Sequence, residues 1–305
     1  MRLESQAVEL PRVQVGRRVA DLVALTKPRV VAMVLLTTLL GYHLGAKAAE
    51  LDYLRLLATL VGTALAAGGT LALNQYLERD LDARMQRTRG RPLPDGRLAP
   101  LEALAFGTVL TLAGLAYLAL SVGSLPAIVT AATSVTYLFA YTPLKPRSSL
   151  CSVVGAVPGA LPPLTGWAAA SGDLGFGGCV LFAIMFLWQI PHALAIGRLY
   201  REDYAQAGIK LLPVVEPDGA STARQIVNNS LALIAVALLP TLIGLTGAVY
   251  LVVALALGLM LLAASLRLAR SGAAADARRL LVATLLYLPF LLLTMAVDKV
   301  PVAPW

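Results

Sequence analysis

The chain has 305 residues, of which 58% are hydrophobic and only 14% are charged. Soluble domains carry about 25% charged residues, so this composition excludes an ordinary water-soluble protein. The formal net charge of +8 suits either nucleic acid binding or a membrane protein whose basic residues collect on one side. The positions of those basic residues decide between the two.

The N-terminal segment has the wrong composition for a targeting peptide. Residues 1–28 carry acidic residues among the arginines and contain no apolar core, so neither a cleaved signal peptide nor an acid-poor transit peptide fits. We expect the encoded N-terminus to be kept and residues 1–28 to form a cytoplasmic segment. Residues 29–300 are then predicted to form a single transmembrane domain.

Nine apolar runs in the chain are long enough to cross a bilayer, which takes about 20 residues. Each run is bounded by charged or Gly/Pro-rich residues, and the runs begin near Val30, Leu54, Leu101, Leu125, Val153, Phe176, Ser230, Tyr250 and Leu280. We therefore predict an all-α polytopic membrane protein with nine transmembrane helices.

The basic residues fall almost entirely on one side of this predicted topology. With nine crossings, all but three of the 25 lysines and arginines share the side of the N-terminus, the exceptions being Lys47, Arg55 and Lys299. Basic loops mark the cytoplasmic side of a membrane protein. The charge therefore predicts a lipid bilayer and no nucleic acid as the partner, with the N-terminus in the cytoplasm.

Candidate metal ligands follow the second predicted helix. Asn74, Glu78 and Asp82 fall at i, i+4 and i+8, which places three oxygen-bearing side chains on one helical face, whereas Asp80 points elsewhere. Mg²⁺ prefers oxygen ligands and commonly bridges one or two carboxylates to substrate phosphates. The alternative is that these acids are solvated charges at a helix end that pair with neighbouring arginines.

A second acidic cluster follows the sixth predicted helix, on the same side of the membrane. Glu202 and Asp203 lie there, and their neighbours include Tyr200, Arg201, Tyr204 and Lys210. Ionisable residues at a membrane boundary indicate function by default. The two clusters are predicted to face each other across a pocket.

Several strings resemble the UbiA superfamily of intramembrane prenyltransferases. The NxxxExxxD pattern of Asn74, Glu78 and Asp82 is similar to the first acidic motif of the superfamily, and Tyr141 with Lys145 matches its YxxxK element. The closer resemblance is to the protohaem IX farnesyltransferase branch. It rests on six strings, which are LTKPRV (25–30), NQYLERDLDARMQRTRGRPLP (74–94), YTPLKP (141–146), GAVPGALPPLTGW (155–167), WQIPHALAI (188–196) and YREDYAQAGIKLLPV (200–214).

The resemblance implies a UbiA-like bundle around a central cavity, which would transfer farnesyl from farnesyl diphosphate to a vinyl group of haem b. Water addition would give haem O and diphosphate. Asn74, Glu78 and Asp82 would hold Mg²⁺. The resemblance also implies a multi-pass protein of the bacterial inner membrane, rather than the mitochondrial one, and contact with haem A synthase or oxidase assembly proteins.

The second acidic motif departs from the wider superfamily. Quinone-pathway members show a DxxxD pair where this chain has Tyr200 and Tyr204 at the corresponding spacing. This departure agrees with the haem branch. The roles of Glu202 and Asp203 are therefore left open. Asp203 is the candidate ligand for a second Mg²⁺, but either acid could instead serve the porphyrin or an arginine.

Basic and aromatic residues near the acidic clusters are candidates for substrate binding. Lys145, with some of Arg87, Arg91 and Lys210, would hold the diphosphate, and Arg201 lies in the second cluster; each arginine could instead contact solvent or lipid headgroups. Tyr141, Tyr200 or Tyr204 could stabilise cations through their ring faces, or could be ordinary interfacial tyrosines.

His192 follows Trp188 and Pro191 on the sixth predicted helix. We expect a haem-related role for it, either as an iron ligand or as a contact of another kind. The alternative is a buried polar side chain that forms a hydrogen bond within the bundle.

Two rival functions are weaker on the residues. A UbiA-type enzyme acting on a quinone precursor is disfavoured by Tyr200 and Tyr204. A transporter would place polar residues near the bilayer midplane, whereas this chain concentrates its charges at one membrane face.

Overall fold

The computed structural model describes residues 11–46, 51–216 and 218–300, and these are almost entirely helical. In chain order the elements are α1 (Pro11–Leu25), α2 (Pro28–Gly45), α3 (Tyr53–Asp82), α4 (Pro100–Ser121), α5 (Ser124–Val135), the π-helix η1 (Thr136–Tyr141), α6 (Thr142–Leu144), α7 (Cys151–Ser171), α8 (Phe176–Leu199), α9 (Arg201–Gln206), α10 (Leu212–Val215), α11 (Ala220–Leu242), α12 (Ala248–Ser271) and α13 (Ala274–Val297). Among the described residues, nine helices are long and apolar enough to cross a membrane, with α5, η1 and α6 forming one of them. The predicted fold class is confirmed.

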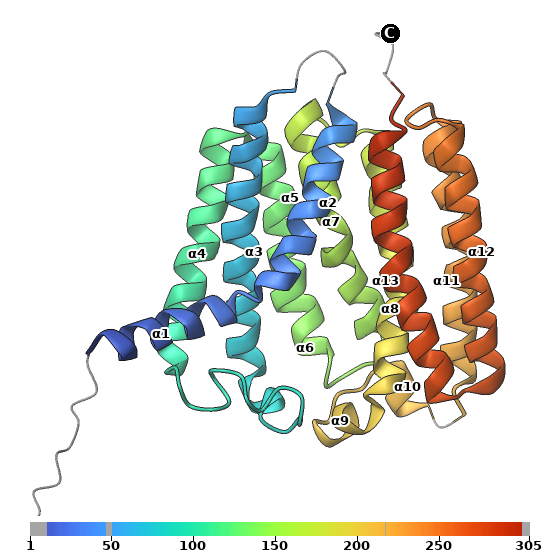
Figure 1. The fold of residues 1–305 in the computed structure, drawn as a ribbon. Helices are drawn as coiled ribbons and strands as arrows, with labels where there is room; N and C mark the ends of the chain where they lie inside the picture. The colour runs from blue at the N-terminus through green and yellow to red at the C-terminus, as the bar shows by residue number, and fades with distance from the viewer. Residues whose placement is uncertain (1–10, 47–50, 217, 301–305) are drawn as a thin grey trace, which may run out of the picture.

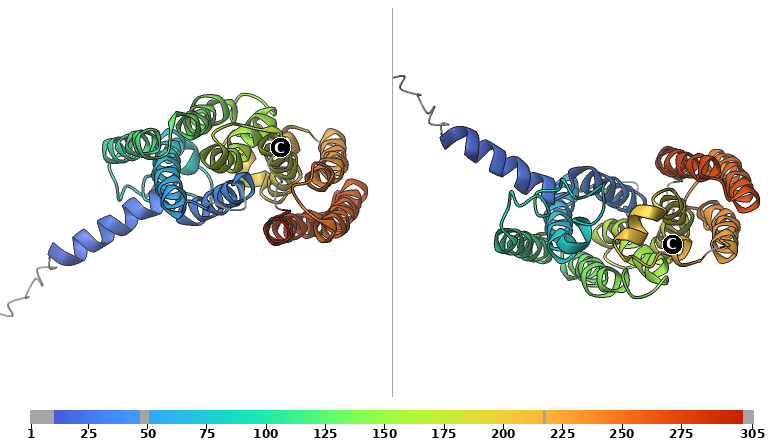
Figure 2. Two further views of the ribbon diagram at one scale, coloured as in Figure 1. Left: turned by 90° about the horizontal axis from the view of Figure 1, so that it is seen from above. Right: turned by 90° about the horizontal axis from the view of Figure 1, so that it is seen from below.

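The nine long helices run between two faces of the molecule (Figure 1). One face, which we call the loop face, carries α1, the connection of residues 83–99, α9 and α10. Viewed along the bundle, α8 lies between a group formed by α2 to α7 and a group formed by α11 to α13 (Figure 2). Both acidic clusters therefore lie at the loop face. This agrees with the expectation that they share one side of the membrane.

Two helix starts differ clearly from the predicted ones. The run expected near Ser230 begins as a helix at Ala220, and the run expected near Leu280 begins at Ala274. Both extensions contain arginines and other polar residues, which an apolar-run criterion does not count as membrane-spanning. A helix can continue into the headgroup region because its backbone hydrogen bonds do not depend on side-chain polarity.

Glycines bring the helices of the first group into close backbone contact. A Cβ on Gly166 of α7 would lie 1.9 Å from the backbone oxygen of Thr38 on α2, and one on Gly114 of α4 would lie 2.4 Å from the backbone nitrogen of Ala66 on α3. Small residues that let backbones approach are the usual packing device between helices in lipid. These two contacts join α2 to α7 and α3 to α4.

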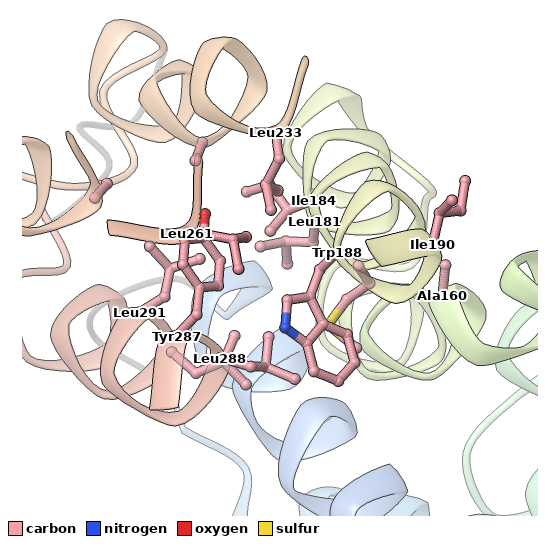
Figure 3. Close-up of a cluster of buried hydrophobic side chains, with 14 of the residues drawn as sticks. Ala160, Leu181, Ile184, Trp188, Ile190, Leu233, Leu261, Tyr287, Leu288 and Leu291 are labelled. Atoms are coloured by element: carbon pink, nitrogen blue, oxygen red, sulfur yellow. The ribbon is translucent and has the colours of Figure 1, made fainter. Parts of the chain in front are cut away.

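The second group packs through large side chains instead. Leu233 of α11, Leu261 of α12 and Tyr287 of α13 are each fully buried in one apolar cluster with residues of α8 (Figure 3). Dispersion contacts in such a cluster are individually small but numerous. This cluster holds α8 against the last three long helices.

The π-helix η1 has a local chemical cause. Pro143 has no backbone N–H, so the carbonyl of Phe139, four residues earlier, loses its usual helical donor. The chain widens to a π turn, and the hydroxyl of Thr142 donates to the carbonyl of Tyr137 at 2.8 Å. Such π turns frequently occur at functional sites, and this one carries Tyr137 and Tyr141.

Candidate active site

The three predicted metal ligands lie at the end of α3 that reaches the loop face. Their exposed fractions are 0% for Asn74, 7% for Glu78 and 2% for Asp82. Burial of all three agrees with their spacing of i, i+4 and i+8, which puts them on one face of the helix. They face the interior of the protein and not the surrounding lipid.

Each buried carboxylate has a basic partner from a different connection. Nζ of Lys145, which directly follows α6, donates to Oε1 of Glu78 at 2.5 Å. Nη1 of Arg91, in the connection after α3, donates to Oδ2 of Asp82 at 2.6 Å. A buried carboxylate without such a partner would be strongly disfavoured, so these pairs make the buried acids tolerable.

Asn74 has a basic partner that the sequence interpretation did not assign to the site. Nζ of Lys27, between α1 and α2, donates to Oδ1 of Asn74 at 3.2 Å, and the amide of Asn74 donates to the hydroxyl of Thr142 at 3.0 Å. Lys27 has φ of 50°, in the left-handed region, at the turn before Pro28. It lies within the LTKPRV string, which was the only signal in the sequence that could have pointed to it.

Two lysines in this cluster differ in their electrostatic setting. Burial, aided by the positive charges of Arg91 and Lys145, lowers the pKa of Lys27 to about 8, although Glu78 and Asp82 oppose the shift. Burial also acts against the charge of Lys145, but Tyr141 and Glu78 outweigh it and raise the pKa of Lys145. Lys145 is thus held as a firm positive charge beside Glu78.

A cavity of about 280 Å³ opens next to this cluster and extends between α2, α3, α5, η1, α7 and α8. Its walls are mainly apolar or hydroxyl-bearing, and they include Tyr137, Tyr141 and Gln189. Nζ of Lys145 lies 4.4 Å from the ring centroid of Tyr141, so the charged cluster adjoins the cavity where Tyr141 lines it. Tyr137 and Gln189 were not predicted, because neither belongs to a charged motif.

Asp203 joins the second acidic cluster to the first. Its Oδ1 accepts the backbone N–H of Gln86 at 3.2 Å, and its Oδ2 accepts that of Arg87 at 3.4 Å. The guanidinium of Arg87 lies over the rings of Tyr200 and Tyr204, at 5.6 and 5.9 Å from their centroids. Asp203 therefore holds the second acidic cluster against the connection that follows α3. That the two acidic clusters face each other across one pocket stays a prediction.

Other predicted site residues lie nearer the surface. Glu202 and Tyr200 are exposed, and with Arg201 they line a second, open cavity of about 750 Å³ at the loop face. The side chain of Lys210 is exposed, while its backbone N–H donates to the carbonyl of Lys145 at 2.8 Å. The structure does not bring these side chains to Glu78 and Asp82.

His192 turns toward α13 and is absent from the cavity lining, although Gln189 and Ala193 on the same helix line the cavity. Its Nδ1 lies 2.9 Å from the hydroxyl of Thr284, and its ring stacks on Trp188 at 4.9 Å between centroids. The indole of Trp188 donates to the carbonyl of the same Thr284 at 3.0 Å. The hydrogen bond to Thr284 agrees with the alternative interpretation of His192, a polar side chain that forms a hydrogen bond within the bundle. A haem contact stays a prediction.

The donor set on α3 fits Mg²⁺. It offers one amide oxygen and two carboxylates, all buried, and Mg²⁺ is commonly held by one or two carboxylates together with substrate phosphates and water. Among the described residues, no three His, Cys, Asp or Glu side chains group closely enough to hold a metal by themselves. A substrate that supplies oxygens of its own would complete this site.

Fold and site together define an intramembrane prenyltransferase. The chain matches the UbiA prenyltransferase family over residues 34–295, and it belongs to that family. It is 49% identical to a protoheme IX farnesyltransferase of Solibacter usitatus over 287 residues, which cover 92% of this chain and 98% of that protein. The enzyme class predicted from the sequence is confirmed.

Solved structures share the fold at low sequence identity. A digeranylgeranylglyceryl phosphate synthase matches with a TM-score of 0.78 and 16% identity, covering 92% of this chain and 98% of that one. A UbiA homologue from Archaeoglobus fulgidus, solved with GPP and Mg²⁺, matches with a TM-score of 0.62 and 15% identity, covering 90% and 99%. These likenesses establish the UbiA-like fold of the bundle.

Proposed function

We propose that this protein transfers the farnesyl group of farnesyl diphosphate to a vinyl group of haem b, with addition of water, giving haem O and diphosphate. The observation that carries the proposal is the buried set of Asn74, Glu78 and Asp82 beside an apolar cavity, each with a basic partner. The names of the curated relatives support the choice of farnesyl donor and haem acceptor.

Asn74, Glu78 and Asp82 would hold Mg²⁺, which supplies charge stabilisation for the departing diphosphate. Support comes from the donor set itself and from the solved UbiA homologue with GPP and Mg²⁺. Asp203 remains the candidate for a second ion. Because its oxygens accept two backbone N–H groups, its other function is to position the connection after α3.

The basic residues of the cluster would exchange partners when substrate binds. In the structure Lys145 and Arg91 neutralise the carboxylates of Glu78 and Asp82. Lys27 donates to the uncharged amide oxygen of Asn74. Diphosphate oxygens would take these cations, Arg91 through its planar fork and the lysines as point charges. Preorganised positive charge of this kind favours heterolysis of the allylic C–O bond, with the electron pair leaving on the diphosphate. Arg87 and Lys210 are further candidates nearer the surface.

The apolar cavity would shelter the farnesyl tail and the allylic cation. Water in contact with that cation would quench it, so the largely apolar wall protects it until it meets the haem vinyl group. The ring of Tyr141 lies beside Lys145 and could stabilise positive charge at this end, worth about 0.5 to 2 kcal/mol. Tyr200, Arg201 and Tyr204 remain candidates for substrate binding, and His192 remains a candidate for a haem contact.

The loop face would lie in the cytoplasm of a bacterial cell, with the protein in the inner membrane. The bias of lysine and arginine toward the side that carries α1 supports this orientation. A partner that accepts the product, such as a haem A synthase or an oxidase assembly protein, would meet the enzyme in the same membrane.

Membranes that contain the protein, incubated with haem b, farnesyl diphosphate and Mg²⁺, test the proposal. Formation of haem O, with one diphosphate released per farnesyl group transferred, is the expected result. Parallel reactions replace haem b by an aromatic acid of the kind that quinone pathways prenylate. If the aromatic acid is prenylated and haem b is not, the proposed acceptor is wrong.

A further inference from the structure

Two hydroxyl groups in the wall of the apolar cavity have no hydrogen-bond partner among the described residues. They are Oγ1 of Thr63 and Oγ of Ser152, whose residues are 3% and 6% exposed. Other hydroxyls of the same wall donate to a carbonyl one turn earlier in their own helix, and these are Thr70, Thr130, Thr133 and Ser134. Among the serine and threonine hydroxyls of the described wall, Thr63 and Ser152 are therefore the exceptions.

An unpartnered buried hydroxyl is costly and needs an explanation. A farnesyl tail cannot provide one, because it has no hydrogen-bonding group. The ligand that satisfies such a hydroxyl inside this cavity must be small and able to accept or donate a hydrogen bond. Water meets both requirements, provided that a second polar group lies within reach.

The two hydroxyls occupy different depths of the cavity. Ser152 is in the first turn of α7, where Cys151 packs in one cluster with Tyr141. A Cβ on Gly155, one turn further along α7, would lie 2.6 Å from the ring of Tyr141. Thr63 lies 15 residues before Glu78 on α3, about 22 Å along the helix at about 1.5 Å per residue. Ser152 is thus the one near the charged cluster.

We propose that Ser152 binds the water molecule whose oxygen becomes the hydroxyl group of haem O. Tyr141 supplies a second polar group in the same wall, because its ring carbon Cζ, which carries the hydroxyl, would lie 3.2 Å from a Cβ on Gly155, one turn from Ser152. Ser152 acts here as a positioning residue. This inference rests on the proposed function and deepens it.

The chemistry gives a held water a specific role. The π electrons of the haem vinyl group form the C–C bond to the first carbon of the farnesyl cation, and positive charge moves to the vinyl carbon next to the pyrrole. A lone pair of the water oxygen closes a C–O bond to that carbon. The proton that water loses passes to an oxygen of the released diphosphate, so atoms and charge balance.

A single bound water also allows the farnesyl cation to react with the vinyl group before any cation reacts with water. Mobile water throughout the cavity would attack the farnesyl cation before the vinyl group did, giving farnesol and diphosphate. A single water fixed on the α7 wall reacts with the second cation only. Without this water, the second cation loses a proton from the adjacent CH₂ group, and the product is an alkene that lacks one water relative to haem O.

The experiment compares products of the full chain in lipid nanodiscs, with haem b, farnesyl diphosphate and Mg²⁺. Ser152→Ala removes the hydroxyl, Ser152→Thr retains it, and Thr63→Val removes the equally buried hydroxyl far from the charged cluster. Mass spectrometry of the porphyrin products measures the ratio of alkene to alcohol. Reactions in ¹⁸O-labelled water identify the oxygen that each alcohol carries.

Ser152→Ala should raise the alkene-to-alcohol ratio at least tenfold, with KM for farnesyl diphosphate changed less than about twofold. Ser152→Thr should restore the alcohol, and Thr63→Val should give the wild-type ratio. An unchanged ratio in Ser152→Ala would overturn the inference. So would a raised KM with an unchanged ratio, which would mean that the hydroxyl contacts the diphosphate. If the wild-type protein forms no farnesylated porphyrin at all, the proposed function itself fails.

Discussion

The two groups of helices differ in what they bury. In the group formed by α2 to α7, the buried polar side chains include amides and carboxylates. Helix α3 carries four of them, which are Asn74, Gln75, Glu78 and Asp82. In the described part of α11 to α13 and its connections, the buried polar side chains are hydroxyls, such as Ser230, Ser265 and Thr284. Among the described residues, buried charged side chains are therefore confined to the first group, while the second group resembles an ordinary apolar core.

Packing differs in the same direction. Helices of the first group approach at glycines, as at Gly166 and Gly114, and leave a cavity between them. Helices of the second group fill their interior with leucines and tyrosines (Figure 3). We infer that the first group is built for chemistry and the second group supports α8.

The largest effect is expected at the buried end of α3. Asp82→Ala removes a carboxylate that is 2% exposed and leaves Arg91 without its partner, so the site loses a metal ligand. We expect the rate of haem O formation to fall at least 100-fold, while the protein still inserts into membranes. Product formation per folded protein is the measurement.

Asp80 offers a matched control two residues away. Its side chain is 79% exposed and lies 3.9 Å from Arg79, outside the buried cluster. Asp80→Ala should keep activity within about twofold, because an exposed ion pair contributes little. Equal losses in both variants would show that negative charge at the loop face matters and that the buried set on α3 does not.

The second prediction concerns stability in the second group. Leu233 is fully buried, so Leu233→Ala leaves a cavity, and we expect a loss of about 2 kcal/mol or more in the free energy of unfolding. Activity per folded protein should change less than twofold. Leu231→Ala on the same helix is the control, because that side chain is 49% exposed. A large loss of specific activity in Leu233→Ala would mean that the second group takes part in the chemistry.

The third prediction tests the close packing of the first group. A Cβ at Gly166 would collide with the backbone of Thr38, so Gly166→Ala must push α2 and α7 apart, at a cost of about 1–3 kcal/mol. Gly90→Ala is the control, since a Cβ there meets nothing within 4 Å. Thermal unfolding of both variants in detergent gives the comparison. Equal unfolding temperatures would contradict the packing difference between the two groups.

The contrast also explains what could be predicted from the sequence. Hydrophobic runs place the nine long helices, and the helical period places Asn74, Glu78 and Asp82 on one face, because both are local properties. The partner of Asn74 is 47 residues away in sequence, at Lys27, and no local rule connects the two. Only the tertiary fold determines such pairs.

Two further features needed the structure for similar reasons. The direction of the His192 side chain depends on which face of α8 packs against α13. The sequence of an apolar helix does not indicate which of its faces packs against a given neighbour. Glu202 and Asp203 are neighbours in sequence, yet Asp203 reaches the connection after α3 and Glu202 is exposed. Adjacent residues on a helix point about 100° apart, so one cluster can serve two environments.

The smallest effect is expected at Glu216, where the chain enters the second group. Its carboxylate accepts the backbone N–H groups of Ser221 and Thr222, at 2.6 and 2.8 Å, in the first turn of α11. Partial burial acts to raise its pKa, but these hydrogen bonds outweigh burial and lower the pKa of Glu216 to about 2. The carboxylate therefore anchors the start of α11.

A group whose pKa is lower in the folded state stabilises the protein above its unfolded pKa, here about 4.5, and loses that contribution as the pH falls toward 2. The unfolding temperature of Glu216→Gln should therefore be a few degrees below that of wild type at pH 7. This difference in unfolding temperature should become smaller as the pH falls from 4.5 to 3. Asp80→Asn, which changes an exposed carboxylate, should show no such narrowing. A gap that stays constant with pH would mean that the charge of Glu216 contributes nothing, and that only the shape of its side chain holds α11 in place.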